Sequence, residues 1–128
     1  MELHVDVAWI LQVAQIAGVR DPSPDDYGVP VAACARHQAE LLDRPVYDGP
    51  YARAAALVHT LGRCPWLERS NLTVAAASGV MYLEASGISV KPTRTDATAL
   101  RDLLLEPSCT APQIAALLRS WPTASHTG

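Results

Sequence analysis

The feature that most constrains the fold is a run over residues 74–83 in which nearly every side chain is apolar. Ser70 before the run is a good helix N-cap and Gly87 after it is a typical helix stop, so the pattern predicts a helix over residues 70–86. Such a helix is apolar on all sides yet too short to cross a bilayer, and therefore belongs at the centre of a bundle. The chain has no phenylalanine and only 5% aromatic residues, so the surrounding core must consist of Ala, Leu, Val and Ile.

Apolar spacing predicts five further helices around this central one. Pro50 suits a first helical turn, Thr110 and Gln113 form a capping box, and residues 44–47 have the pattern of an extended segment. A chain of 128 residues is the size of one domain. The sequence predicts a compact all-α bundle of about six helices around a buried central helix, with one domain over residues 1–121 and a polar tail over residues 122–128. The predicted helices span residues 3–17, 29–42, 50–62, 70–86, 95 or 96 to 105, and 110–121.

Charge and cysteine content exclude several classes of function. The formal net charge of −3 argues against a protein that binds nucleic acid by neutralising phosphates. No apolar window is long enough to span a membrane, and Glu2 and Asp6 stand where a signal peptide carries basic residues, which predicts a cytoplasmic protein. The three cysteines have no CxxC spacing, so neither a disulfide framework nor a zinc site is expected.

The most informative stretch lies between the third and fourth predicted helices, over residues 59–75. Its loop faces the N-terminus of the apolar helix, where unpaired N–H groups and the helix dipole favour anions, phosphate above all. The loop also carries a carboxylate, a thiol and a guanidinium within six residues. This junction is therefore the expected place for chemistry.

The junction resembles the motif of the Fic/Doc family, His-Pro-Phe-x-Asp/Glu-Gly-Asn-Lys/Gly-Arg, commonly followed by Thr-Ala. Placed without gaps, the motif falls on residues 64–73, where Pro65, Trp66, Glu68 and Thr73 match in type. A slip of one residue would instead give Asn71 the role of the motif's asparagine.

The resemblance extends over nearly the whole chain and is closest to the short Doc-like toxins of bacterial toxin–antitoxin systems. Residues 33–38 resemble the family's Ala-x-Ala-Arg-Pro-Gln run, and residues 42–47 fall where the family has its substrate-positioning flap. Residues 82–87 resemble the end of the family's central helix. The resemblance implies the same helical fold.

In Fic/Doc enzymes the motif transfers part of a nucleoside triphosphate to a protein hydroxyl. Most members transfer AMP, and Doc transfers the terminal phosphate to elongation factor Tu. The resemblance therefore implies a transferase that uses ATP and Mg²⁺, a target in the translation machinery, and an antitoxin peptide as partner. On this resemblance, Glu68 is expected to bind the metal and Arg69, Ser70 and Asn71 the anion, with Trp66 as a pocket wall. Cys64 at the histidine position, or His59 one turn before the connector, would handle the proton.

Several positions depart from the family pattern. Cys64 stands at the histidine, Arg69 at the glycine, Ser70 at the asparagine, Asn71 at the lysine and Leu72 at the arginine. A missing general base typically costs about 10²–10⁴ in rate, and the missing arginine removes a bidentate phosphate clamp. Two alternatives to the transferase follow: an inactive Fic fold that binds a partner protein, and a pocket adapted to a different small-molecule reaction.

Each candidate residue also has a purely structural interpretation. Cys64 is expected to be a small buried residue, and His59 a surface or half-buried helical histidine. Glu68 compensates the helix dipole, and Trp66 belongs to the core or to a pocket wall with equal weight. The remaining histidines with helical context, His4 and His37, are expected to face solvent.

Overall fold

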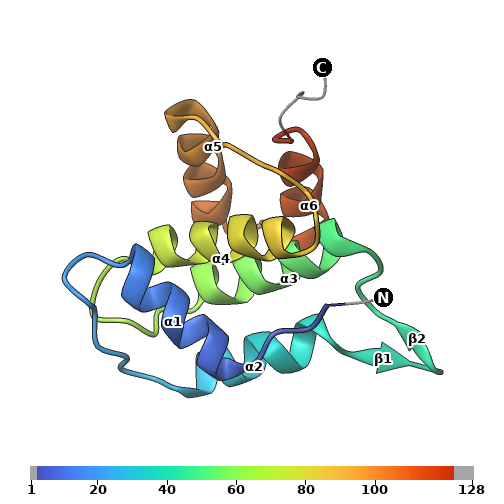
Figure 1. Cartoon of the computed structure of the whole chain (residues 1–128), viewed down its shortest axis with the longest axis horizontal. Helices are drawn as coiled ribbons and strands as arrows, with labels where there is room; N and C mark the ends of the chain where they lie inside the picture. Colours follow the sequence, from blue (N-terminus) through green and yellow to red (C-terminus); the bar gives the residue numbers. More distant parts are fainter. Residues whose placement is uncertain (1–2, 123–128) are drawn as a thin grey trace.

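The computed structural model describes residues 3–122 and is built almost entirely from helices (Figure 1). This architecture confirms the predicted all-α class. A short two-stranded antiparallel hairpin, β1 (Glu40–Leu41) and β2 (Arg44–Pro45), lies between the second and third helices. The six helices are α1 (Val7–Ala17), α2 (Gly28–His37), α3 (Pro50–Arg63), α4 (Asn71–Ala85), α5 (Arg94–Leu105) and α6 (Ala111–Arg119).

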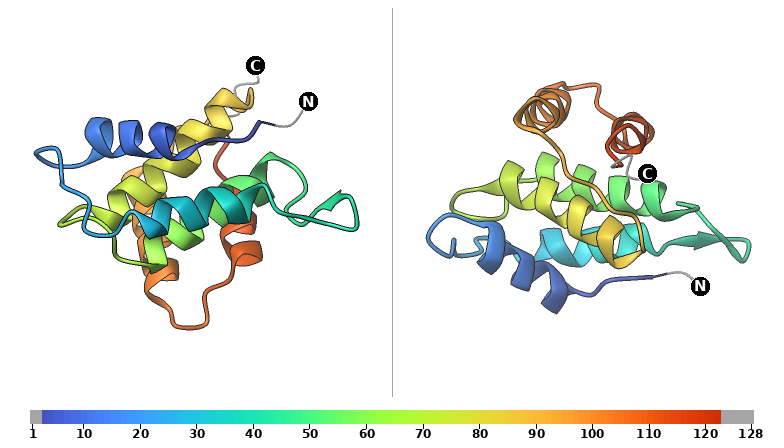
Figure 2. Two further views of the ribbon diagram at one scale, coloured as in Figure 1. Left: turned by 90° about the horizontal axis from the view of Figure 1, so that it is seen from below. Right: turned by 45° about the horizontal axis from the view of Figure 1, so that its top comes forward.

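The centre of the molecule is the pair α3 and α4, which lie side by side between two outer layers. Helices α1 and α2 cover one face of the pair, and α5 and α6 cover the other (Figure 2). The two central helices approach closely because Gly79 of α4 has no side chain where it faces Val58 of α3: a Cβ on Gly79 would lie 2.6 Å from Val58 Cγ2. The predicted central helix is therefore present, but α3 is the more completely buried of the two, with an unbroken buried run from Arg53 to Val58.

The second helix is shorter than predicted. It ends at His37 instead of residue 42, and the following chain turns back through the hairpin. The Val46 amide donates to the Ala39 carbonyl at 2.9 Å, which fixes the hairpin base. Leu42 and Asp43 at its tip have φ of 53° and 65°, the left-handed pair that a tight two-residue turn requires. The local hydrogen bonds of the hairpin thus override the helical spacing of its apolar residues.

Side-chain caps begin α1, α5 and α6, of which only the capping box at α6 was expected from the sequence. Thr110 and Gln113 form the predicted capping box at α6. Helix α5 begins at Arg94 with a second box between Thr93 and Asp96, and α1 begins at Val7 with Asp6 as its cap, later than predicted. Pro122, the first residue of the predicted tail, pairs with Val90, and residues 123–128 lie outside the described residues.

A buried polar cluster holds the extended N-terminal segment against the core. The Val5 amide donates to His37 Nε2 at 3.1 Å, the Tyr82 hydroxyl donates to the Leu3 carbonyl, and Arg53 Nε donates to the Tyr82 hydroxyl at 2.8 Å. His37 is only 1% exposed, so its expected solvent-facing position is wrong. The reason is its partner: the N-terminal segment covers the helix end and supplies a donor to the imidazole. His4 is exposed, as predicted.

Stability is expected to fall as the pH drops below about 6.5. Burial, with His4 and Arg53 nearby, lowers the pKa of His37 to about 4. Between pH 6.5, the usual pKa of a histidine, and pH 4, the unfolded chain binds a proton at His37 that the folded chain does not. The free energy of unfolding therefore falls by about 3 kcal/mol over this range. Urea denaturation at pH 7 and pH 4.5 measures the loss. In His37→Gln, whose amide oxygen can still accept from Val5, the loss should shrink, and an unchanged pH dependence would contradict this assignment.

Two further expectations concern cysteines and membranes. All three cysteines are free, as predicted, with Cys34 and Cys109 buried and Cys64 exposed. Within residues 3–122, no helix has both the length and the apolar character needed to cross a membrane.

Candidate functional site

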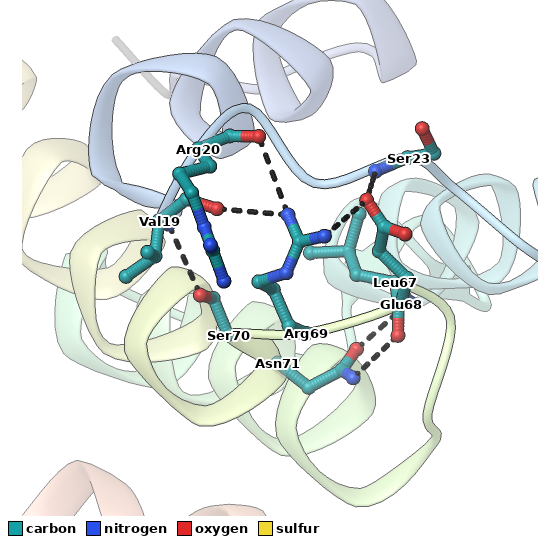
Figure 3. Close-up of polar contacts among 8 residues, drawn as sticks. All are labelled: Val19, Arg20, Ser23, Leu67, Glu68, Arg69, Ser70 and Asn71. Carbon is teal, nitrogen blue, oxygen red and sulfur yellow. Dashed lines mark hydrogen bonds and ion pairs between the residues drawn. The ribbon is translucent and has the colours of Figure 1, made fainter.

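The loop between α3 and α4 is closed on itself by one side chain, that of Asn71. Its Oδ1 accepts from the backbone amides of Trp66 and Leu67, both at 3.0 Å. Its Nδ2 donates to the Leu67 carbonyl at 2.9 Å, so every polar atom of the amide group has a partner in the loop (Figure 3). Asn71 thus fixes the loop that precedes α4.

The loop over residues 18–27, between α1 and α2, lies directly against this junction (Figure 3). Arg69 Nη1 donates to the carbonyls of Val19 at 3.0 Å and Arg20 at 3.3 Å. Ser70 Oγ accepts from the Val19 amide at 3.1 Å. Ser70 has a φ of 69° and makes no side-chain capping bond to α4, which differs from its predicted role as an N-cap. Its hydroxyl connects two loops instead.

Glu68 belongs to the same contact between loops. Its Oε1 accepts from the Ser23 amide at 3.0 Å, and its own amide donates to the Ser23 carbonyl at 3.0 Å. The same carboxylate oxygen lies 2.9 Å from Arg69 Nη2, with both side chains more than a third exposed. Such an exposed pair contributes little energy. Among the described residues, no group of three His, Cys, Asp or Glu side chains is placed to hold a metal ion.

Trp66 and Cys64 lie at opposite extremes of exposure. Trp66 is fully buried and its carbonyl accepts from the amides of Asp25 and Asp26, so it anchors the junction loop in the core. It does not line the cavity between α4 and α5, and its burial favours its interpretation as a core residue. Cys64 caps the end of α3 and is exposed, so the expectation that it is buried is wrong. The cause is its position at the C-terminal end of α3, where the chain leaves the helix at the surface before Trp66 returns it to the core.

His59 makes its polar contacts away from the junction loop. Arg36 Nη1 lies 2.7 Å from His59 Nδ1, and His59 Nε2 lies 3.0 Å from the Cys109 carbonyl. Because arginine only donates, Nδ1 accepts and Nε2–H donates to the carbonyl. Burial, with help from the charges of Arg36 and Arg63, lowers the pKa of His59. The imidazole is therefore neutral near pH 7, with both nitrogens engaged.

The structure brings five of the predicted site residues together at the junction and places His59 elsewhere. The side chains of Glu68, Arg69 and Ser70 contact residues 19–23. Trp66 accepts from the loop over residues 18–27 through its carbonyl, and Asn71 accepts from the Trp66 amide. His59 belongs to a cluster with Arg36 and Tyr47. Sequence reasoning missed the partners of these residues. The acceptor and donor groups on residues 19–23 are backbone atoms, about which side-chain motifs carry no information.

The arrangement defines an all-α protein whose two central helices are joined by a loop fixed through its own polar side chains. No family model matches the chain. A protein described as toxin Doc from Mycolicibacterium smegmatis is 30% identical over an alignment of 131 residues that covers the whole of both chains. The chain belongs to the family of Doc toxins.

Proposed function

We propose that this chain is the toxin of a toxin–antitoxin pair and that it acts by binding a protein, without transferring a phosphoryl or nucleotidyl group. The observation that carries this proposal is the closed junction loop, in which Arg69, Ser70 and Asn71 already have internal partners. The relationship to toxin Doc supports the toxin role, and an antitoxin is the partner that such a role implies.

The residues at the motif positions fit Mg²⁺ and ATP poorly. Glu68 offers a single carboxylate whose Oε1 already accepts from Ser23 and pairs with Arg69. To bind a phosphate through their side chains, Arg69 and Asn71 would have to give up their present partners, and each hydrogen bond lost costs about 0.5–1.5 kcal/mol. His59, the candidate base on α3, has both ring nitrogens engaged. These contacts support binding in place of group transfer.

The hairpin is the surface that we assign to the target, which the resemblance implies is a protein of the translation machinery. Its tip and base expose apolar side chains: Leu41 is 67% exposed, Leu42 88% and Val46 51%. Leu42 also adopts a left-handed backbone conformation that bulky residues rarely take. Such strain is characteristic of positions retained for function over stability.

Leu42→Asn should weaken target binding while leaving the fold intact. Asparagine tolerates the left-handed conformation better than leucine, so the free energy of unfolding should stay the same or rise slightly. Growth arrest on expression should decrease, because the most exposed apolar side chain of the hairpin is lost. Leu105→Asn, at another exposed leucine on α5, is the matched control and should retain full arrest. Equal arrest by both variants would remove the hairpin tip from the binding surface.

The proposal as a whole is tested by expressing Glu68→Ala and Cys64→Ala in a bacterial host. Both variants should arrest growth as the unmodified chain does, because neither side chain acts chemically. Intact mass spectrometry of translation proteins from the arrested cells should show no added phosphate or AMP. Loss of arrest in both variants, together with an added group on a target that only the unmodified chain produces, would establish the transferase instead.

A further inference from the structure

A second candidate site lies outside the contacts that close the junction loop, in a cavity of about 270 Å³ between α4 and α5. Helix α5 stands across the N-terminal half of α4, on the face opposite α1 and α2 (Figures 1 and 2). Leu72 and Thr73, in the first turn of α4, form one wall, and residues of α5 form the other. None of the nine lining residues is acidic, in a chain whose formal net charge is −3.

Two arginines of α5 face this cavity. Arg94 and Arg101 are seven residues apart, two helical turns, so they lie on one side of the helix about 10 Å apart along its axis. Within residues 3–122 Arg94 forms no ion pair or hydrogen bond. In the same part of the chain, Arg101 pairs only with its neighbour Asp102 at 3.2 Å, in an exposed contact of little energy. Both guanidinium groups are therefore available to a ligand.

The position of Arg94 has no stabilising explanation in the fold. It is the first residue of α5, where the positive end of the helix dipole disfavours a cation. The carboxylate of Asp96 in the same turn accepts from the Thr93 amide in the capping box and does not line the cavity. The first turn of α4, which unlike that of α5 has no side-chain cap, adds a second positive helix end to the same cavity.

The rest of the lining sets the character of the ligand. Leu100 and Leu104 are buried and form an apolar floor, with Ala76 and Ala97 beside them. The hydroxyls of Thr73 and Thr98 add two groups that can donate to an anion. The volume is slightly below the range of about 300–1,000 Å³ for sites of drug-sized molecules.

We propose that this cavity binds a small organic anion, a phosphate or carboxylate group carried on an apolar or aromatic body. Arg94 and Arg101 hold the charged group, and the leucine floor takes the body. This site does not depend on the function proposed above, because it uses neither the junction loop nor the hairpin.

The test is an NMR titration of the full chain with four compounds. AMP and 3-phenylpropionate carry a charged group and a flat body, adenosine lacks the charge, and inorganic phosphate lacks the body. AMP, 3-phenylpropionate or both should produce saturable shifts at Thr98 and Leu100, with much weaker binding of adenosine and phosphate. Binding by AMP alone identifies a phosphate ligand, and binding by 3-phenylpropionate alone identifies a carboxylate ligand.

Two single substitutions and one control test whether ligand binding depends on Arg94 and Arg101. Arg94→Gln and Arg101→Gln should each raise the Kd about tenfold or more, since hydrogen bonds to charged groups are among the strongest single contacts. Arg44→Gln, at an exposed arginine of the hairpin, removes the same charge and should leave the Kd unchanged. The proposal is overturned if neither charged compound binds, if the α5 substitutions have no more effect than Arg44→Gln, or if phosphate alone binds as tightly as AMP.

Discussion

Trp66→Ala is expected to lower the free energy of unfolding by about 3–5 kcal/mol, as large aromatic truncations in a core do. Trp66 is fully buried within the loop that joins α3 to α4. Its Nε1 has no hydrogen-bond partner within the described residues, so the loss reflects packing alone. A domain of this size is typically stable by about 5–15 kcal/mol, so the variant should be close to unfolding at 37 °C.

Urea denaturation followed by circular dichroism measures the effect. Trp66→Phe keeps an aromatic ring and forfeits no hydrogen bond, so it should cost distinctly less than alanine. Trp9→Ala removes a half-buried tryptophan from α1 and is the matched truncation. If Trp66→Ala costs no more than Trp9→Ala, Trp66 is not the anchor of the junction.

Asn71→Ala should cost about 2–4 kcal/mol, because the backbone amides of Trp66 and Leu67 lose their acceptor in a partly buried loop. The expected loss is large for a polar residue in a connecting segment. If Asn71 instead served mainly to bind a ligand, its removal would leave the stability of the free protein nearly unchanged. Thermal and urea denaturation of the ligand-free chain separate these cases.

Two variants make this measurement specific to the Asn71 amide. Asn71→Asp keeps an acceptor for both backbone amides and places a negative charge at a helix N-terminus, so it should lose less stability than alanine despite losing the bond to the Leu67 carbonyl. Thr73→Ala, an exposed residue in the same turn of α4, should be close to neutral. Equal stabilities for Asn71→Ala and Thr73→Ala would contradict the closed loop.

Local signals in the sequence predicted the helices well where capping chemistry decides the boundary. Pro50 begins α3, and Thr110 with Gln113 begins α6, because each of these requirements is met within one helical turn. The prediction failed at the end of α2, where β1 and β2 pair in a tight hairpin and the backbone of distant Val5 bonds to His37. A periodic apolar pattern carries no information about such partners.

The sequence predicted where the candidate site lies in the fold, but not which partners its side chains bind or how exposed they are. The alignment of residues 64–73 with a known motif placed the junction correctly between two helices. It could not show that Glu68 and Arg69 contact residues 19–23, some 45 to 50 positions earlier, because those partners are main-chain groups. Exposure of Cys64 was missed for a related reason, since the direction of a chain leaving a helix depends on what the next residue packs against.

The most direct test of the closed junction loop is an NMR titration of the full chain with ATP and Mg²⁺. The side-chain amide of Asn71 and the backbone amides of Leu67 and Ser70 report on the loop itself, while shifts confined to α5 and to Leu72, Thr73 and Ala76 of α4 belong to the separate cavity. We predict no saturable shift of the three junction signals at millimolar ATP and Mg²⁺. Saturable shifts of these signals that disappear in Glu68→Ala would show that the loop opens to hold a metal nucleotide, and would contradict the account.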